Sequence, residues 1–202
     1  MPAIGITGGV GTGKSTFCQY LGRLMPAAKI FDADAAAHAL VDLAEVKTAI
    51  RERFGSGVFS EEGDLNRPAL GAIIFRDAAK KRALEQILHP RIRRQWSAEA
   101  EKHRNSPDFF FADIPLLYET GGENLCDRVV VVGCSRHVQL QRLRDRSIDE
   151  QSARQMIQSQ LPLAEKVQRA DYVIWNNGPT GLLHEQANRL VDLWRNQTWT
   201  KA

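Results

Sequence analysis

At 202 residues the chain is long enough for one well-buried α/β core with modest insertions, and it is too short for two ordinary independent domains. Lysine and arginine number 27 against 24 aspartates and glutamates, and the resulting formal charge of +3, without a polybasic tail, suits a small polyanionic ligand as well as nucleic acid. The N-terminus lacks the residue order of a signal peptide and no apolar run reaches membrane-spanning length, so we expect a soluble, cytoplasmic protein.

The first predicted element is a buried strand at residues 3–7, "AIGIT", which leads into a glycine-rich turn. Within "GITGGVGTGKST", the residues Gly8, Gly13, Lys14 and Ser15 fit the pattern G-x-x-x-x-G-K-[ST]. A helix is predicted directly after the turn, because apolar residues recur there at helical spacing. These apolar residues are Phe17, Tyr20, Leu21 and Leu24. A strand before the pattern and a helix after it are the context that a phosphate-binding loop requires.

The glycines give this turn its chemistry, because residues without a Cβ atom can adopt the backbone angles that turn successive N–H groups inward. The N–H groups would form a concave nest for phosphate oxygens at the positive end of the following helix. Lys14 would reach the β- and γ-phosphates, and the Ser15 hydroxyl would ligate Mg²⁺. The alternative is a glycine-rich turn with a solvent-exposed lysine, and the flanking strand and helix favour the nucleotide site over it.

A second, weaker strand is predicted at residues 28–34, "AKIFDAD", and it should neighbour the first strand in the sheet. Its carboxyl end carries Asp32 and Asp34, at the edge where open α/β sheets bind ligands. One carboxylate could accept or position the proton of an attacking hydroxyl, and the other could cap the helix that starts at "AAAHAL". We favour catalysis for Asp34 and allow capping for Asp32.

Some seventy residues without a strand candidate follow, and we interpret them as a helical insertion. Pro68 should open one helix as a proline at the first helical position, and a long helix that runs into Pro90 should be kinked or broken there. The segment "LHPRIRR" carries His89 and Arg91. By themselves these residues indicate no function, because a histidine beside a proline is usually structural and arginines on helices are usually solvated.

Three further strands are predicted, at residues 108–114, 128–134 and 171–176. Most of the strand candidates are near-continuous apolar runs separated by helical patterns, which indicates a doubly wound, five-stranded parallel sheet covered on both faces. Asp113 ends the run "FFFAD", where a P-loop enzyme keeps the carboxylate that holds Mg²⁺ through water or orients substrate. The alternative is a solvated aspartate at a strand end.

Two arginines, Arg142 and Arg146, lie four residues apart in "QLQRLRDRS" and should share one helix face. Like charges at this spacing repel on an isolated helix, so they make better sense facing a shared polyanion than on a wholly solvated helix, which is the alternative. A second helical insertion at residues 147–170 follows, with a break at "SQLPL". We interpret the first insertion as an acceptor-binding region and the second as a lid, because phosphoryl transfer must exclude water.

The combination of motifs is more specific than any one of them. The series "GITGGVGTGKS", "FDAD", "GDLNRPAL", "LEQILHPRI", "DIPLLYE", "QLQRLRDR" and "RADYVIWNNG" closely resembles the dephospho-CoA kinase family over residues 4–178. The patterns "DADxxAH", "HPxI" and "DIPLLYE" are distinctive of that family among P-loop kinases. The resemblance implies a P-loop NTPase fold and transfer of the ATP γ-phosphate to the ribose 3′-hydroxyl of dephospho-CoA, the last step of coenzyme A synthesis. Many members have a Pro-Gly turn where this chain reads "LVDLAEVKTA", a departure that concerns only the start of the acceptor region.

The resemblance also implies the residues of the ATP site. The ATP phosphates would be cradled by Gly11, Thr12, Gly13, Lys14, Ser15 and Thr16. Arg142 and Arg146 would clamp phosphates or adenine as the lid closes, and Asn177 with Gly178 would lie beside the adenine.

On the acceptor side, the resemblance implies that Asp34 is the base and that His89, Arg91 and Asp113 line the site. Asp113 would also share Mg²⁺ with Ser15. The residues themselves leave open which aspartate takes the proton, with Asp32 and Asp113 as the other candidates.

We therefore expect a single P-loop kinase domain with three parts. These parts are a core at about residues 1–34, 106–146 and 171–202, a helical acceptor-binding region at about 35–105, and a lid at about 147–170. The partners should be ATP and dephospho-CoA, with Mg²⁺ and without nucleic acid, a membrane or an obligate protein partner.

Three other functions fit these residues less well. Another small-molecule or nucleoside monophosphate kinase would share the P-loop and lid, so only the acceptor segments argue against it. A regulatory GTPase would need a guanine-reading N-K-x-D tetrapeptide, which the sequence lacks. A nucleic-acid-binding ATPase would need a more basic surface with interleaved aromatic residues. The three cysteines, Cys18, Cys126 and Cys134, form no C-x-x-C pair and predict buried thiols instead of a zinc site or disulfides.

Overall fold

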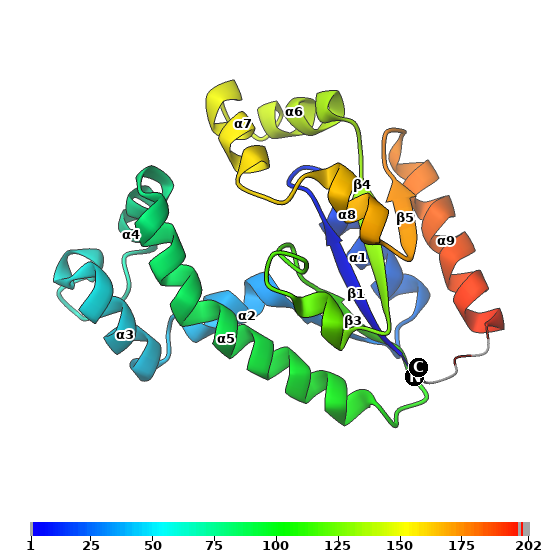
Figure 1. Ribbon diagram of the computed structural model, residues 1–202, viewed down its shortest axis with the longest axis horizontal. Coiled ribbons are helices and arrows are strands. Elements are labelled where there is room, and N and C mark those ends of the chain that lie inside the picture. Colours follow the sequence, from blue (N-terminus) through cyan, green and yellow to red (C-terminus); the bar gives the residue numbers. More distant parts are fainter. Residues whose placement is uncertain (1, 198, 200–202) are drawn as a thin grey trace. The chain divides into compact units, whose positions relative to one another are not determined.

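The computed structural model describes residues 2–197 and Trp199, and the chain divides into two compact units (Figure 1). One unit combines the chain up to Phe31 with the chain from Glu99 onward, and it contains the sheet. The other unit, Asp32–Ala98, is helical.

The sheet has five strands among the described residues, all parallel, in the order β2-β3-β1-β4-β5 (Figure 1). The strands are β1 at Ala3–Gly8, β2 at Lys29–Asp32, β3 at Phe110–Asp113, β4 at Arg128–Gly133 and β5 at Tyr172–Trp175. Each strand predicted from the sequence is confirmed, with ends that differ slightly. The predicted doubly wound parallel sheet is confirmed as well.

The strand β2 does not neighbour β1, and the sequence-based expectation on this point is wrong because β3 lies between them. Burial explains the order: all four residues of β3 are buried, whereas Phe31 alone is buried in β2. An interior strand is covered on both faces, so the fully buried β3 takes the inner place and β2 takes the edge. In the register of β3 against β1, Asp113 lies opposite Ile6.

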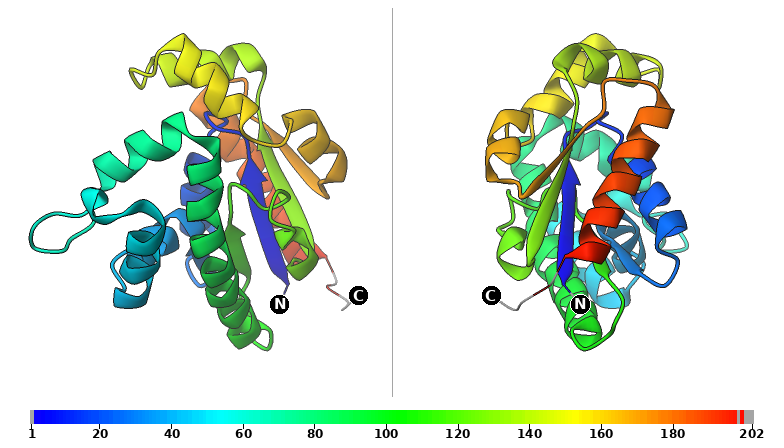
Figure 2. Two further views of the ribbon diagram at one scale, coloured as in Figure 1. Left: turned by 60° about the vertical axis from the view of Figure 1, so that its left-hand side comes forward. Right: turned by 90° about the vertical axis from the view of Figure 1, so that its right-hand side faces the viewer.

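Helices cover both faces of the sheet. The helices of this unit are α1 at Lys14–Leu24, α6 at Arg136–Arg144, α7 at Glu150–Gln158, α8 at Leu163–Arg169 and α9 at Thr180–Asn196. Helices α1 and α9 pack on one face, and α8 lies on the other (Figure 2). The helices α7 and α8 are separated by a non-helical stretch at residues 159–162, so the break predicted at "SQLPL" is confirmed.

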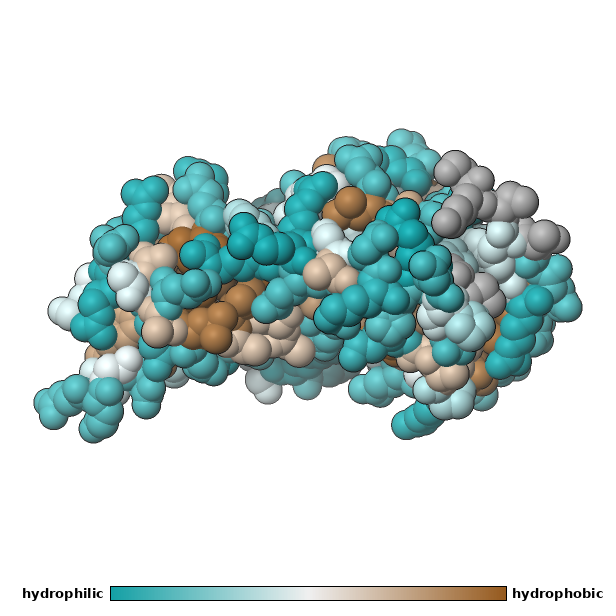
Figure 3. Space-filling view, turned by 90° about the horizontal axis from the view of Figure 1, so that it is seen from below, coloured by the Kyte–Doolittle hydropathy of each residue, from teal (hydrophilic) through white to brown (hydrophobic). Residues whose placement is uncertain are grey.

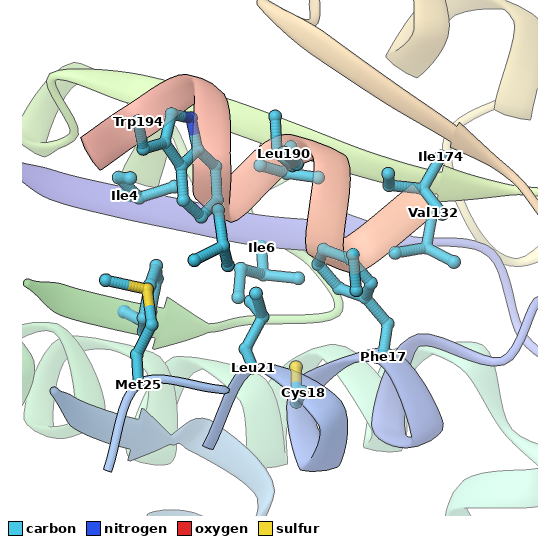
Figure 4. Close-up of a cluster of buried hydrophobic side chains, with 14 of the residues drawn as sticks. Ile4, Ile6, Phe17, Cys18, Leu21, Met25, Val132, Ile174, Leu190 and Trp194 are labelled. Atoms are coloured by element: carbon cyan, nitrogen blue, oxygen red, sulfur yellow. The ribbon is translucent and has the colours of Figure 1, made fainter. Parts of the chain in front are cut away.

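The main core fills the layer between the sheet and the helices α1 and α9. Figure 4 shows Phe17 and Leu21 of α1 and Leu190 and Trp194 of α9 clustered against the strands. Phe17 and Leu21 are fully buried, and burial of an apolar side chain of this size contributes about 1.5–3 kcal/mol. The helical spacing of apolar residues after the glycine-rich turn is thereby confirmed as a core face.

The helical unit has a smaller core of its own. Its helices are α2 at Ala33–Leu40, α3 at Ala44–Phe54, α4 at Arg67–Arg76 and α5 at Ala78–His103, of which the last turn belongs to the other unit. The buried residues of this core cluster are Val41, Val46, Ile50, Val58, Leu70 and Ile87. Hydrophobic surface is also visible over this unit, at the left of Figure 3. The exposed side chain of Phe75 is 58% accessible.

Two prolines shape this unit. Pro68 lies in the first turn of α4, one residue after the predicted first position, because the helix begins at Arg67. The Asn66 side chain caps the helix by accepting from the Ala69 N–H at 3.0 Å. Pro90 lies inside α5, and the helix continues past it without a break. The neighbouring Arg91 donates from Nη1 to the Ile87 carbonyl at 2.7 Å, a side-chain bond within the turn that contains the proline.

Among the residues that the structure describes, no helix combines the length and the apolar character needed to cross a membrane. None of the three cysteines forms a disulfide, and Cys18 and Cys134 are buried whereas Cys126 is half-buried. Burial raises the pKa of Cys126 to about 12, and it also raises the pKa of Cys134.

Candidate active site at the glycine-rich loop

The glycine-rich loop connects the end of β1 to the start of α1, and its shape depends on glycine at two positions in particular. Gly13 has a φ of 93°, in the region that favours glycine, and a Cβ there would collide with the Asn176 amide nitrogen. A Cβ on Gly8 would collide with the backbone oxygen of Val132 on the neighbouring strand. The loop therefore lies tightly against β4 and the end of β5.

The carbonyl groups of the loop accept hydrogen bonds from side chains around it. The Gly8 oxygen accepts from Lys166 Nζ at 3.2 Å, and the Val10 oxygen accepts from Gln139 Nε2 at 2.8 Å. The Thr12 oxygen accepts from Asn176 Nδ2 at 2.8 Å. With the carbonyls held in this way, the N–H groups at the start of α1 are available to an anion, which is the arrangement of a phosphate nest.

Thr12 stabilises the loop from within. Its backbone N–H and its hydroxyl both donate to the Gly9 carbonyl, at 3.3 and 2.8 Å, and its side chain is fully buried. The next predicted phosphate-binding residues lie at the start of α1, where Ser15 is exposed and Thr16 is partly exposed. Among the hydroxyl-bearing residues Thr12, Ser15 and Thr16, Ser15 is therefore the most exposed.

Lys14 forms an ion pair with Asp113 Oδ1, and both side chains are largely buried, at 12% and 9% exposure. Asp113 is the last residue of β3, so the order of the sheet brings it beside the loop. The alternative of a solvated aspartate at a strand end is therefore excluded. The pair places a cation and a carboxylate together at the carboxyl edge of the sheet, where parallel sheets bind ligands.

Arg142 joins the loop to the end of β5. Its Nη1 donates to the carbonyls of Gly11 and Thr12, at 3.4 and 3.1 Å, and its Nη2 donates to the Asn176 carbonyl at 3.0 Å. Asn177 accepts with Oδ1 from the Ser135 N–H at 2.8 Å, which connects the same segment to the N-cap of α6. Gly178 follows it, just before α9.

Arg146 does not share a helix face with Arg142, and that sequence-based expectation is wrong. Helix α6 ends at Arg144, and Arg146 is exposed in the turn that follows. The turn passes through Ser147 with a φ of 61° before the Asp149 side chain caps α7 by accepting from the Ser152 N–H. Asp149 is the N-cap of α7, which begins at Glu150, so Arg146 belongs to the turn between two helices and not to a continuation of α6.

In the helical unit, Asp32 and Asp34 have different positions. The Asp32 side chain caps α2, accepting from the N–H groups of Asp34 and Ala35 at 2.9 and 3.0 Å. The capping role allowed for Asp32 is thus confirmed. Asp34 lies in the first turn of α2 and is exposed, so it belongs to a helix and not, as predicted, to the carboxyl end of the second strand, which ends at Asp32.

His89 and Arg91 both lie on α5. Burial lowers the pKa of His89 below its ordinary value, with the Glu85 charge opposing that shift and the Lys81 charge adding to it. Arg91 Nε lies 3.6 Å from Glu45 Oε1, which connects α5 to α3.

Five further residues around the loop were not identified as site residues from the sequence. They are Gln139, Gln160, Lys166 and Asn176, together with Glu119, which contacts Lys166. Three of them nevertheless lie within the quoted family motifs, Glu119 in "DIPLLYE", Gln139 in "QLQRLRDR" and Asn176 in "RADYVIWNNG". Lys166 did leave one signal, because it lies three residues after Leu163 in α8, a spacing at which an apolar residue is expected on a packed helix face. Burial lowers the pKa of Lys166, and the hydrogen bond and charge of Glu119 oppose that change.

Ser15 and Asp113 fit the donor chemistry of Mg²⁺, which prefers hydroxyl and carboxylate oxygens. Within the described part of the chain, no group of three or more His, Cys, Asp and Glu side chains could hold a metal. Mg²⁺ is usually bound through one or two carboxylates plus substrate phosphates, so a sparse protein donor set suits a metal that arrives with a nucleotide.

A parallel sheet with a lysine-bearing glycine-rich loop, an acidic residue on the adjacent strand and helices over the loop define a P-loop kinase. The family model described as Dephospho-CoA kinase matches residues 2–181. The chain therefore belongs to the dephospho-CoA kinase family.

Individual relatives agree with the family model. The chain is 38% identical to a dephospho-CoA kinase of Bacillus anthracis, over 95% of this chain and 96% of the relative. It is 41% identical to a dephospho-CoA kinase of Syntrophotalea carbinolica, over 95% and 91% of the two chains.

Solved structures extend the likeness to the fold. A Thermus thermophilus protein superposes with a TM-score of 0.80 at 29% identity, covering 98% of each chain. A dephospho-CoA kinase from Campylobacter jejuni superposes with a TM-score of 0.66 at 25% identity, covering 95% of this chain and 96% of that one. A shikimate kinase from Acinetobacter baumannii, with a TM-score of 0.54 at 18% identity and coverage of 96% and 93%, shares the fold alone.

Proposed function

We propose that this protein transfers the γ-phosphoryl group of ATP to the ribose 3′-hydroxyl of dephospho-CoA, giving coenzyme A and ADP. The observation that carries the proposal is the Lys14–Asp113 pair at the glycine-rich loop of a chain that belongs to the dephospho-CoA kinase family. Phosphoryl transfer passes through a loose transition state, so the protein acts mainly by positioning groups and stabilising charge.

On the donor side, we infer that the backbone N–H groups of the loop bind the ATP phosphates through the segment Gly11–Thr16. Lys14 would leave its contact with Asp113 and neutralise charge on the phosphates, which supports transfer because that charge redistributes in the transition state. Ser15 and Asp113 would hold Mg²⁺, which supplies further neutralisation of the phosphate charge when it is bound. Asn177 and Gly178 would lie beside the adenine.

On the acceptor side, Asp34 would take or position the proton of the 3′-hydroxyl, and His89 and Arg91 would bind the acceptor. Arg142 and Arg146 would contact phosphates or adenine as the lid at residues 147–170 closes. The remaining division into a core and an acceptor-binding region at residues 35–105 belongs to the same proposal. We also expect a cytoplasmic enzyme whose partners are its small-molecule substrates.

An acceptor panel tests the function directly. ADP release would be measured with ATP, Mg²⁺ and one of dephospho-CoA, AMP, CMP or shikimate. Of the four acceptors, we expect only dephospho-CoA to give ADP release, together with a product that co-elutes with coenzyme A. Turnover with shikimate or a nucleoside monophosphate, at a kcat/KM equal to or above that for dephospho-CoA, contradicts the proposal. Shikimate belongs in the panel because a shikimate kinase shares this fold.

A further inference from the structure

Lys166 is a fully buried lysine, with a side-chain exposure of 0%. Its Nζ contacts the Gly8 carbonyl at 3.2 Å, the Pro115 carbonyl at 3.0 Å and Glu119 Oε1 at 2.8 Å. An ammonium group has three protons to donate, and these three acceptors match that number. A lysine is almost never fully buried unless its charge is paired, as Glu119 pairs it here.

The three acceptors belong to three different parts of the sheet-containing unit. Gly8 ends β1 and begins the glycine-rich loop, and Pro115 follows Asp113 by two residues. The Pro115 carbonyl also accepts from the Thr7 hydroxyl at 2.9 Å. The end of β1 and the segment after β3 are thus linked directly by this bond and indirectly through Lys166. Glu119 Oε1 accepts from the Leu161 N–H at 2.9 Å, in the break between α7 and α8.

A need to hold α8 against the rest of the sheet-containing unit does not by itself explain why a lysine occupies position 166. A second ion pair, between Arg169 and Glu123, already joins α8 to the chain after β3. A buried ion pair is often no more stabilising than apolar residues of similar volume, because burying two charges removes their hydration. What Lys166 adds is a bond to the loop that cradles phosphate and a bond beside the segment that carries Asp113.

We propose that Lys166 is a positioning residue for phosphoryl transfer. It fixes the start of the glycine-rich loop and the segment after Asp113 in place relative to α8. The effect on phosphoryl transfer rests on the proposed function. The effect on nucleotide binding does not, because the loop binds nucleotide without the acceptor. Small displacements of the loop or of Asp113 would reduce the rate, because catalysis of this type depends on preorganised donors.

The test compares Lys166→Met with Arg169→Met, which removes a cation of the same helix that is paired with the same chain segment. Circular dichroism and the melting temperature report folding, calorimetry gives the Kd and stoichiometry of ADP binding, and kcat is expressed per ADP-binding site. For Lys166→Met we expect ADP binding at least about tenfold weaker and kcat at least about tenfold lower, with KM for dephospho-CoA within about threefold of wild type. Arg169→Met should match wild type in both.

If the two variants agree within about twofold in ADP Kd and in kcat per site, Lys166 only fastens α8 and the inference is overturned. Should Lys166→Met fail to fold, Glu119→Gln decides, because an amide oxygen still accepts from Leu161 and Lys166 but carries no charge. We expect about threefold or greater weakening of ADP binding in that variant, and wild-type binding overturns the inference. A wild-type protein that binds ADP but ignores dephospho-CoA refutes the proposed function, and the ADP comparison still decides the role of Lys166.

Discussion

Lys14 is held at the glycine-rich loop by its ion pair with the buried Asp113. We expect Lys14→Met to lower kcat at least about 10²- to 10³-fold, because it removes a cation that stabilises the transition-state charge. ADP release with dephospho-CoA measures the effect, with circular dichroism to show that the fold is retained. Lys47→Met is the matched control, since Lys47 also pairs with an aspartate, Asp64, but on the exposed surface of the helical unit. Near-normal turnover of Lys14→Met contradicts the assignment of the donor site.

Asp32 and Asp34 provide a closely matched pair of variants. They are two residues apart, and the Asp32 side chain is the N-cap of α2 whereas Asp34 lies in the first turn of that helix. Asp34→Asn should lower kcat by about 10²- to 10⁴-fold, the contribution typical of a general base, while the binding of ADP and dephospho-CoA persists. Asp32→Asn should leave kcat almost unchanged, because asparagine also caps helices well. Steady-state kinetics and calorimetry would be carried out on both variants.

Two outcomes would reassign these carboxylates. If Asp34→Asn binds neither nucleotide nor dephospho-CoA, Asp34 is a metal ligand or a structural residue. If Asp34→Asn turns over normally while Asp113→Asn is inactive, the proton goes to Asp113 instead.

At the scale of an element, the end of α6 separates the roles of two arginines. Arg142 bonds to the loop and to the end of β5, so Arg142→Met should lower kcat/KM for ATP by about a hundredfold and weaken ADP binding in parallel. Arg146 lies beyond α6 and is exposed, so Arg146→Met should reduce turnover with less loss of ADP binding, as expected for a group that acts on lid closure. A change in turnover below about twofold would place Arg146 among solvated side chains.

Helix α5 carries a pH-sensitive residue, because burial lowers the pKa of His89. The unfolded chain then binds a proton near pH 6.5, before the folded chain does, so acid favours unfolding. The stability linked to His89 is present above about pH 6.5 and is lost as the pH falls through the lowered pKa of the folded state. Urea unfolding between pH 7.5 and 5 should therefore show a smaller acid-side loss for His89→Gln than for wild type. The exposed His38→Gln is the control, and equal losses in wild type and His89→Gln contradict this prediction.

At the scale of the whole molecule, the two units have cores of unequal size. The core of the sheet-containing unit includes residues from β1, β4, β5, α1 and α9, whereas that of the helical unit is a smaller cluster around Val46 and Ile50. Because local opening is easier where less apolar surface is buried, amides of α3 and α4 should exchange with solvent faster than those of β1 and β4. Native-state hydrogen exchange by mass spectrometry measures this difference. Equal protection in the two units would show that they open together.

Much of the sheet-containing unit could be predicted from the sequence, because the patterns that indicate its strands, loop and first helix are local. The strand at "AIGIT", the glycine pattern and the helix after it are adjacent in the chain, so propensity and spacing were sufficient to locate Lys14 and Ser15. The break at "SQLPL" is also a local feature, and so is the cap at Asp32 in the helical unit. Arg146 shows the limit of such reasoning, because four-residue spacing predicts a shared face only if the helix continues, and here α7 begins too soon.

The sequence by itself determined the class of fold, the phosphate-binding loop and the family resemblance, because each depends on residues that are close together or on motifs in a set order. Tertiary structure decided the place of β3 between β2 and β1, since that order depends on which strand buries both faces. It also decided which side chains hold the loop in shape. Lys166 lies 158 residues from Gly8, and Asn176 lies 164 residues from Thr12. No local pattern specifies contacts of that separation, which form only when the sheet and its helices bring the segments together.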